Sequence, residues 1–168
     1  MDAKQTSEQA KGPITTTDRT SEREVVVTRT FNGPARIIFD AWTKPELIMK
    51  WWTPASFGIT FISCEMDVRT GGTYKFVMGH AAFDQPMAFH GRYIEVEPNK
   101  KIVWTNEEGG EAGSVTTVTF EEKDGKTYLR LSDVYPSKAA LDEAMEQGSI
   151  GGYPEQFNQL DAVLKGLN

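Results

Sequence analysis

The stretch that decides the fold is RTGGTYKFVM, residues 69–78, in which bulky side chains alternate with small or charged ones. Tyr74, Phe76 and Met78 take every second position after a Gly-Gly pair. This period of two indicates a strand that leaves a tight turn with its large side chains on one face. A sheet face this bulky must be covered by a helix or must surround a cavity.

Short runs with the same alternation follow one another through the middle of the chain, separated by turn residues. Asp124-Gly125 between two such runs is typical of a β-hairpin. Connections this short favour antiparallel neighbours, because parallel strands need long crossovers. We expect strands at residues 24–31, 59–68, 72–80, 87–96, 101–106, 114–122 and 127–134.

Helical patterns frame these strands. Pro34 is placed to start a first short helix, and a second is expected at residues 44–51. At the C-terminus, Ser137 is a candidate N-cap, and apolar residues recur with helical spacing between 153 and 164. The glycines at 148–152 predict a break in this helix, because each glycine costs roughly 1 kcal/mol in a helix interior.

Together these elements predict an α+β fold. A curved antiparallel sheet of about seven strands would wrap around a long C-terminal helix, with two short helices after the first strand. Residues 1–22 are polar, with Ile14 as their only large aliphatic side chain apart from the first Met. We expect this segment to be a disordered tail and residues 23–168 to form one domain.

Composition excludes several classes of partner. The formal net charge of the 168 residues is -6, which argues against nucleic acids and anionic membranes. No apolar run is long enough to cross a bilayer, and no signal-peptide pattern opens the chain. The single cysteine, Cys64, excludes an internal disulfide and suits the cytoplasm. Two histidines without helical pairing predict neither a metal site nor a cofactor.

A series of short motifs resembles the activator-of-heat-shock-ATPase-like family, within the START-like, birch-pollen-allergen-like (SRPBCC) superfamily. The motifs are FNGPA at 31–35, AWTxPE at 41–46, KWWxP at 50–54, DxRxGGxYxF at 67–76 and FxGxYxEVxP at 89–98. The likeness runs from about Glu24 to Leu164 and implies the helix-grip fold that the element order also predicts. It does not select a function, because the superfamily includes lipid carriers, polyketide cyclases, hormone receptors and co-chaperone domains.

The bulky side chains on the predicted inward face are the candidate ligand-binding residues. They could simply pack on the last helix, but Tyr hydroxyls and Trp N–H groups need partners that a dry core does not supply. A pocket between the sheet and the C-terminal helix would satisfy them. The predicted lining is Trp52, Phe57, Met66, Tyr74, Phe76, Phe89, Tyr93, Trp104, Met145 and Phe157.

No catalytic residue is assigned from the sequence. The alternation of inward and outward positions along their strands (strand parity) would allow His80 and Asp133 to form a general-base dyad. A structural or solvent-facing histidine is the preferred interpretation. No serine or cysteine motif frames a nucleophile, and Cys64 has no positive charge beside it. Asp67 and Arg69 are interpreted as a structural ion pair at a turn.

Three functions stay open. The favoured one is a small cytosolic protein that binds an apolar or aromatic molecule between the sheet and the C-terminal helix. The second is a polyketide-cyclase-like or hydrolase-like enzyme that uses the same cavity. The third is an interaction module that stimulates a chaperone ATPase, the least favoured because the chain lacks the extra N-terminal domain of such co-chaperones. Open sheet edges also suggest a homodimer.

Overall fold

The computed structural model describes residues 14–107, 113–148 and 150–167. Within them, eight strands form one antiparallel sheet in the order β1-β2-β8-β7-β6-β5-β4-β3. All seven predicted strands are present, which confirms the alternation pattern as the main signal. The strands are β1 Thr16–Arg19, β2 Glu24–Asn32, β3 Thr60–Met66, β4 Thr73–Gly79, β5 Met87–Glu97, β6 Lys101–Thr105, β7 Val115–Lys123 and β8 Lys126–Val134.

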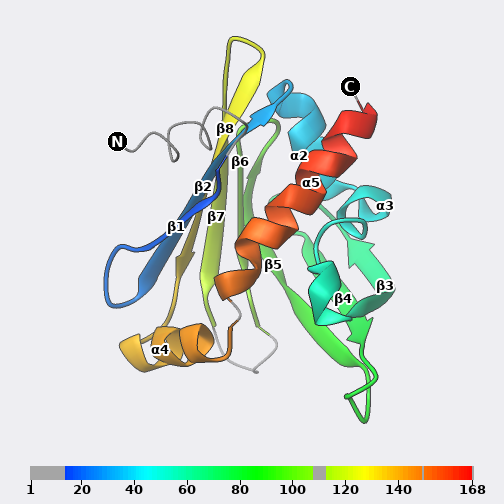
Figure 1. Ribbon diagram of the computed structural model, residues 1–168, viewed down its shortest axis with the longest axis vertical. Helices are drawn as coiled ribbons and strands as arrows, with labels where there is room; N and C mark the ends of the chain where they lie inside the picture. The colour runs from blue at the N-terminus through cyan, green and yellow to red at the C-terminus, as the bar shows by residue number, and fades with distance from the viewer. Residues whose placement is uncertain (1–13, 108–112, 149, 168) are drawn as a thin grey trace, which may run out of the picture.

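Helices cover one face of this sheet, and Figure 1 shows the last of them, α5, lying diagonally across it. Two short helices and one 3-10 turn follow β2, as α2 Ala35–Thr43, α3 Pro45–Ile48 and η1 Ala55–Phe57. The C-terminal part consists of α4 Lys138–Glu146, η2 Ile150–Gly152 and α5 Tyr153–Leu167. In Figure 1, α2 lies beside the C-terminal half of α5, whereas α4 lies near the opposite end of the sheet. The arrangement is the predicted helix-grip fold.

β1 corrects the prediction of a disordered tail over residues 1–22. Thr16–Arg19 pairs with Val25–Thr28 of β2, although all four of its residues are exposed. Backbone hydrogen bonds to the sheet edge, rather than buried side chains, hold this strand, so the composition gives no sign of it. Arg19 also forms an ion pair with Asp142 of α4 at 2.8 Å. Residues 1–13 of the predicted tail lie outside the described residues, and a single domain over 23–168 stays a prediction.

The predicted break in the C-terminal helix is confirmed. Gly148 follows α4 with a φ of 81°, and η2 separates it from α5. The predicted N-cap is also present, since the Ser137 hydroxyl accepts a hydrogen bond of 3.0 Å from the Ala140 N–H. The long helix that grips the sheet therefore begins at Tyr153, and α4 is a separate, short cover.

The core is densest where α2 and α5 meet the sheet. Phe157 of α5 is fully buried, and its ring centroid lies 5.8 Å from that of Phe31 and 6.3 Å from that of Trp42. Trp51 is equally buried and donates its indole N–H to the Ala41 carbonyl at 3.0 Å. Burying such large aromatic side chains contributes about 1.5–3 kcal/mol each. Among the described residues, no helix has the length and apolar character needed to span a bilayer.

Candidate ligand-binding site

In the part of the chain that the structure describes, two cavities of very different size lie on the covered face of the sheet. The small cavity, of about 20 Å³, is lined by Trp42, Ile48, Trp52, Met66, Tyr74, Phe76, Tyr93, Ile102 and Trp104. The large cavity, of about 420 Å³, lies between the sheet, η1 and the segment from α4 to α5. The two share Trp42, Trp52 and Trp104, so three indoles form the partition between them.

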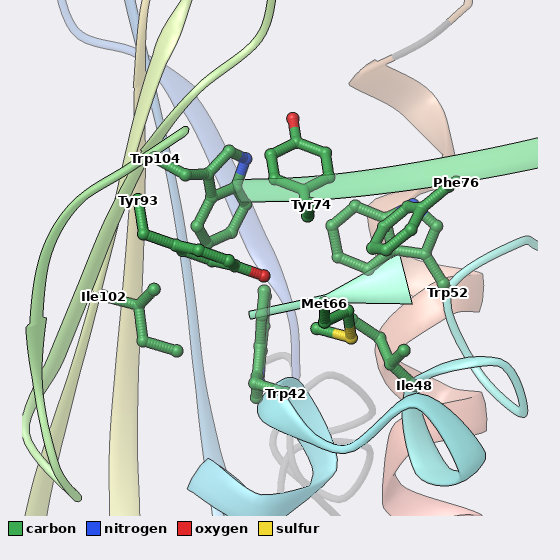
Figure 2. A pocket seen from close by; sticks show the side chains of 9 residues that line it. All are labelled: Trp42, Ile48, Trp52, Met66, Tyr74, Phe76, Tyr93, Ile102 and Trp104. Carbon is green, nitrogen blue, oxygen red and sulfur yellow. The ribbon is translucent and has the colours of Figure 1, made fainter. Parts of the chain in front are cut away.

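The small cavity is a packing gap. Figure 2 shows the Tyr93 hydroxyl pointing toward Trp42 and Met66 across this space, while the Tyr74 hydroxyl points away from it. Tyr74 donates instead to the Thr105 carbonyl at 2.9 Å. Burial raises the pKa of Tyr93, so its hydroxyl stays protonated. A space of about 20 Å³ holds at most one water molecule, because a single water needs roughly 10–15 Å³.

One wall of the large cavity is polar and is built around Asp133 of β8. Thr116 of β7 stands directly opposite in the strand register, and its hydroxyl donates to one oxygen of the Asp133 carboxylate. The Tyr153 hydroxyl, at the start of α5, donates to the other oxygen at 2.6 Å. Asn106, just after β6, donates to the Thr116 hydroxyl at 3.2 Å. Side chains from β7 and from the start of α5 thus bind one carboxylate of β8, and a residue of the loop after β6 supports the β7 side chain.

Asp133 is a buried acidic residue without a cationic partner. It is only 6% exposed, and none of the ion pairs among the described residues includes it. Burial raises the pKa of its carboxyl group, and the hydrogen bonds from Thr116 and Tyr153 only partly oppose that shift. A buried carboxylate without a cation is costly, and such groups concentrate at functional sites.

The second part of the cavity lining is an aromatic wall. Phe57 of η1 and Phe89 of β5 join the three shared indoles there. The ring centroids of Trp52 and Trp104 lie 6.3 Å apart, and those of Trp42 and Trp52 lie 5.9 Å apart. The buried indole nitrogen of Trp42 has no hydrogen-bond partner in the described part of the chain. This wall therefore offers apolar surface to a bound molecule.

Side chains of α5 fix the loop that carries the aromatic wall. Gln156 donates to the Trp52 carbonyl at 2.6 Å, and Gln159 donates to the Thr53 carbonyl at 2.9 Å. Glu155 accepts hydrogen bonds from the backbone N–H and the hydroxyl of Ser56, at 2.9 and 2.5 Å. The segment before and within η1 is thereby held against α5, which makes this wall largely pre-formed.

The ten predicted lining residues separate into three groups. Trp52, Phe57, Phe89 and Trp104 line the large cavity. Met66, Tyr74, Phe76 and Tyr93 line only the small one.

Met145 and Phe157 line neither cavity, and we remove both from the candidate site. Met145 is 43% exposed, and its sulfur accepts a hydrogen bond from Arg19. It lies on the solvent side of α4, where a helical stripe of only a few residues does not define the buried face. Phe157 is removed for the opposite reason, since other rings enclose it completely.

The dyad considered from strand parity is not formed. The Nδ1 atom of His80 accepts a hydrogen bond of 2.8 Å from the Ala82 N–H, and Asp133 is bound by Thr116 and Tyr153 instead. Parity correctly indicated that Asp133 points inward, but it could not identify its partners. Asp67 and Arg69 form an exposed ion pair at 3.0 Å, as interpreted from the turn. Among the described residues, no group of three or more His, Cys, Asp or Glu is placed to hold a metal ion.

Sequence reasoning missed the polar wall. Asn106, Thr116 and Tyr153 come from three separate elements, and nothing in their spacing along the chain brings them together. One signal was available, because an aspartate at an inward position of an alternating strand needs buried partners. That requirement points to β7, the neighbouring strand that places Thr116 opposite Asp133.

Comparisons with known proteins agree with this fold. The model of the family described as "Activator of Hsp90 ATPase homolog 1-like protein" matches residues 32–165. A solved structure from Rhodobacter sphaeroides is 19% identical with a TM-score of 0.82, covering 92% of this chain and 99% of that one. The solved structure of Ms6760 from Mycobacterium smegmatis is 24% identical with a TM-score of 0.77, covering 92% of this chain and 99% of that one.

A third solved structure, an AHSA1-like protein from Aeromonas hydrophila, is 16% identical with a TM-score of 0.65, covering 84% of this chain and 93% of that chain. At these identities the structures show the fold alone. No curated protein matches the chain.

Proposed function

The chain belongs to the family of activator-of-Hsp90-ATPase-homologue-1-like proteins, and from this premise we propose that it binds an apolar or aromatic small molecule in the large cavity. One observation carries the proposal: about 420 Å³ of space lined by both an aromatic wall and a polar wall. This volume falls within the range of roughly 300–1,000 Å³ that is typical of small-molecule sites.

Packing energetics support the same function. Protein interiors contain few voids larger than a water molecule, because each empty volume forfeits contacts between its walls. The neighbouring small cavity, at about 20 Å³, follows that rule, whereas the large cavity, which opens to the surface, leaves aromatic side chains beside about 420 Å³ of unfilled space on the same sheet face. A bound molecule would cover the apolar part of this lining and restore the missing contacts.

Binding is favoured over the two other functions. An enzyme of cyclase or hydrolase type would need an acid–base pair or nucleophile, and His80 is engaged with its own loop. Stimulation of a chaperone ATPase rests on the description of the family alone. The cytoplasmic location stays a prediction, as does a homodimer through β1 or β3, the two edge strands of the sheet.

The proposal is tested with prodan, a neutral aromatic dye that has no N–H or O–H donor and becomes brightly fluorescent in apolar surroundings. We expect saturable binding of one dye per chain, accompanied by quenching of the tryptophans that line the cavity. Ala144 of α4 lines the large cavity, so Ala144→Phe should fill it and weaken binding at least about tenfold.

A matched control lies on the same helix. Ala139 is exposed, so Ala139→Phe adds the same ring to α4 without entering the cavity. This variant should bind prodan as the wild type does. Absence of saturable binding in the wild type, or equal binding by both variants, would contradict the proposal.

A further inference from the structure

Asp133 is the only residue with a formal charge among the described residues that line the large cavity. We propose that the molecule bound there carries a protonated amine attached to an apolar or aromatic body, and that the Asp133 carboxylate binds this amine. The inference deepens the proposed function and rests on it, because it names the chemical class of the ligand.

The carboxylate has acceptor capacity left for such a group. Two carboxylate oxygens offer about four lone-pair sites. The hydroxyls of Thr116 and Tyr153 occupy one site on each oxygen. Both donors are neutral, so they orient the carboxylate without compensating its charge. A ligand ammonium group can supply both the missing donors and the missing positive charge.

The polar wall also holds this carboxylate in a fixed position. Asn106 donates to the hydroxyls of Thr116 and Ser114, at 3.2 and 2.9 Å, so the donor to one Asp133 oxygen is itself oriented. Tyr153 reaches the other oxygen from α5. A binding group whose supporting hydrogen bonds are already made loses little entropy when a ligand arrives.

The remaining walls suit a cation better than an anion. Trp42, Trp52 and Trp104 present indole rings, the side chains that attract cations most strongly through their faces. The chain has a formal net charge of -6, which favours the approach of cationic molecules. A ligand carboxylate would meet Asp133 as a like charge in a poorly solvated space. The pKa of Asp133, raised by burial, also indicates a site that lacks its counter-charge.

Three indole derivatives with the same ring and similar side chains distinguish a cationic ligand from a neutral or an anionic one. Tryptamine carries an ammonium group, 3-propylindole is its uncharged isostere, and indole-3-propionate is an anion. Each would be titrated against the prodan-bound wild-type protein at neutral pH. We expect tryptamine to displace the dye at concentrations about 10–100 times lower than 3-propylindole, the effect of a hydrogen bond to a charged group. Indole-3-propionate should be the weakest competitor.

The Asp133→Asn variant assigns the preference to this residue, because asparagine has the same shape without the charge. The readout is the ratio of the tryptamine and 3-propylindole displacement constants, which we expect to fall to near one. Asp124→Asn is the matched control, since it removes one negative charge from the β7–β8 turn. Asp124 has a positive φ of 56°, which asparagine tolerates, and this variant should keep the wild-type ratio.

The wild-type series decides the inference even if Asp133→Asn does not fold. Equal displacement by tryptamine and 3-propylindole would overturn the amine assignment and leave the binding function intact. A ratio in Asp133→Asn equal to that of the wild type would overturn the role of Asp133. Failure of prodan to bind the wild type would instead overturn the proposed function, and this inference with it.

Discussion

The two ends of one sheet face differ sharply, although Trp42, Trp52 and Trp104 line the cavities at both. At one end the space is about 20 Å³, and at the other it is about 420 Å³. Two helices on this face, α2 and α4, differ in how many residues they bury. α2 buries six of its nine residues, whereas α4, also of nine residues, buries only Leu141.

The large cavity forms where α4, which contributes only Ala144 to the lining, inserts few side chains above the sheet. An amphipathic helix with a wide apolar face fills the space above a sheet, whereas a mostly polar helix leaves that space unfilled. The break between α4 and α5 at Gly148 adds to the difference, because the chain turns there instead of continuing along the sheet. Substitutions in the packed core and at the large cavity should therefore differ in their effects on stability and on binding.

The largest contrast is expected from removing one ring of the packed core and one ring at the rim of the large cavity. Phe157→Ala should lower the free energy of unfolding by about 3–5 kcal/mol, because the ring is fully buried among other aromatic side chains. Phe57→Ala should cost less than about 1 kcal/mol, because Phe57 is 40% exposed at the rim of the large cavity. Urea unfolding of both variants checks this, and equal losses would remove the distinction between the packed core and the cavity rim.

A smaller, opposite effect is expected at the polar wall, where Asp133→Asn should stabilise the unliganded protein at neutral pH. The raised pKa of Asp133 means that the folded protein binds this proton more tightly than the unfolded chain does. Wild-type stability therefore falls as pH rises from the unfolded-state pKa, about 3.9, through the folded pKa. We expect Asp133→Asn to raise the Tm by about 2–4 °C at pH 7, equivalent to roughly 1 kcal/mol.

The advantage of Asp133→Asn should shrink toward zero as the pH falls below the unfolded-state pKa of about 3.9, because the wild-type carboxyl is then protonated in both states. Thermal unfolding between about pH 3 and 8 measures this trend, with Asp124→Asn as the control. A variant that is less stable than the wild type throughout would show that Asp133 stabilises the fold rather than serving a ligand.

The smallest effect is expected from the glycines of η2. A Cβ atom on Gly152 would lie 3.1 Å from both Phe57 and Pro54, whereas one on Gly151 would meet nothing within 4 Å. Gly152→Ala should therefore displace the aromatic wall and weaken prodan binding about two- to fivefold, a change of roughly 0.5–1 kcal/mol. Gly151→Ala should leave the affinity unchanged. Equal affinities for the two variants would show that Phe57 is not part of the binding surface.

Most of the fold could be predicted because local patterns encode it. Alternation identified seven strands, and the glycines at 148–152 identified the break before α5. β1 escaped prediction, because its pairing with β2 uses backbone groups that every residue carries. A strand of four exposed polar residues has no distinguishing composition.

The candidate site could be predicted only in part. Parity places Tyr74 and Phe89 on the same sheet face but cannot tell that one packs in the small cavity and the other lines the large one. That division depends on which segments insert side chains above the sheet, such as Ile48 of α3 at the small cavity and Ala144 of α4 at the large one, which is a property of three-dimensional packing. The partners of Asp133 were likewise set by strand register and by where α5 begins.

The central claim, that a ligand occupies the large cavity and not the small one, is tested most directly by methyl NMR during a prodan titration. Ala144 and Leu131 line only the large cavity, whereas Met66 and Ile102 line only the small one. We predict that the methyl signals of Ala144 and Leu131 shift with saturation while those of Met66 and Ile102 stay nearly unchanged. Larger shifts at Met66 and Ile102, or no shift at Ala144 and Leu131, would contradict the account.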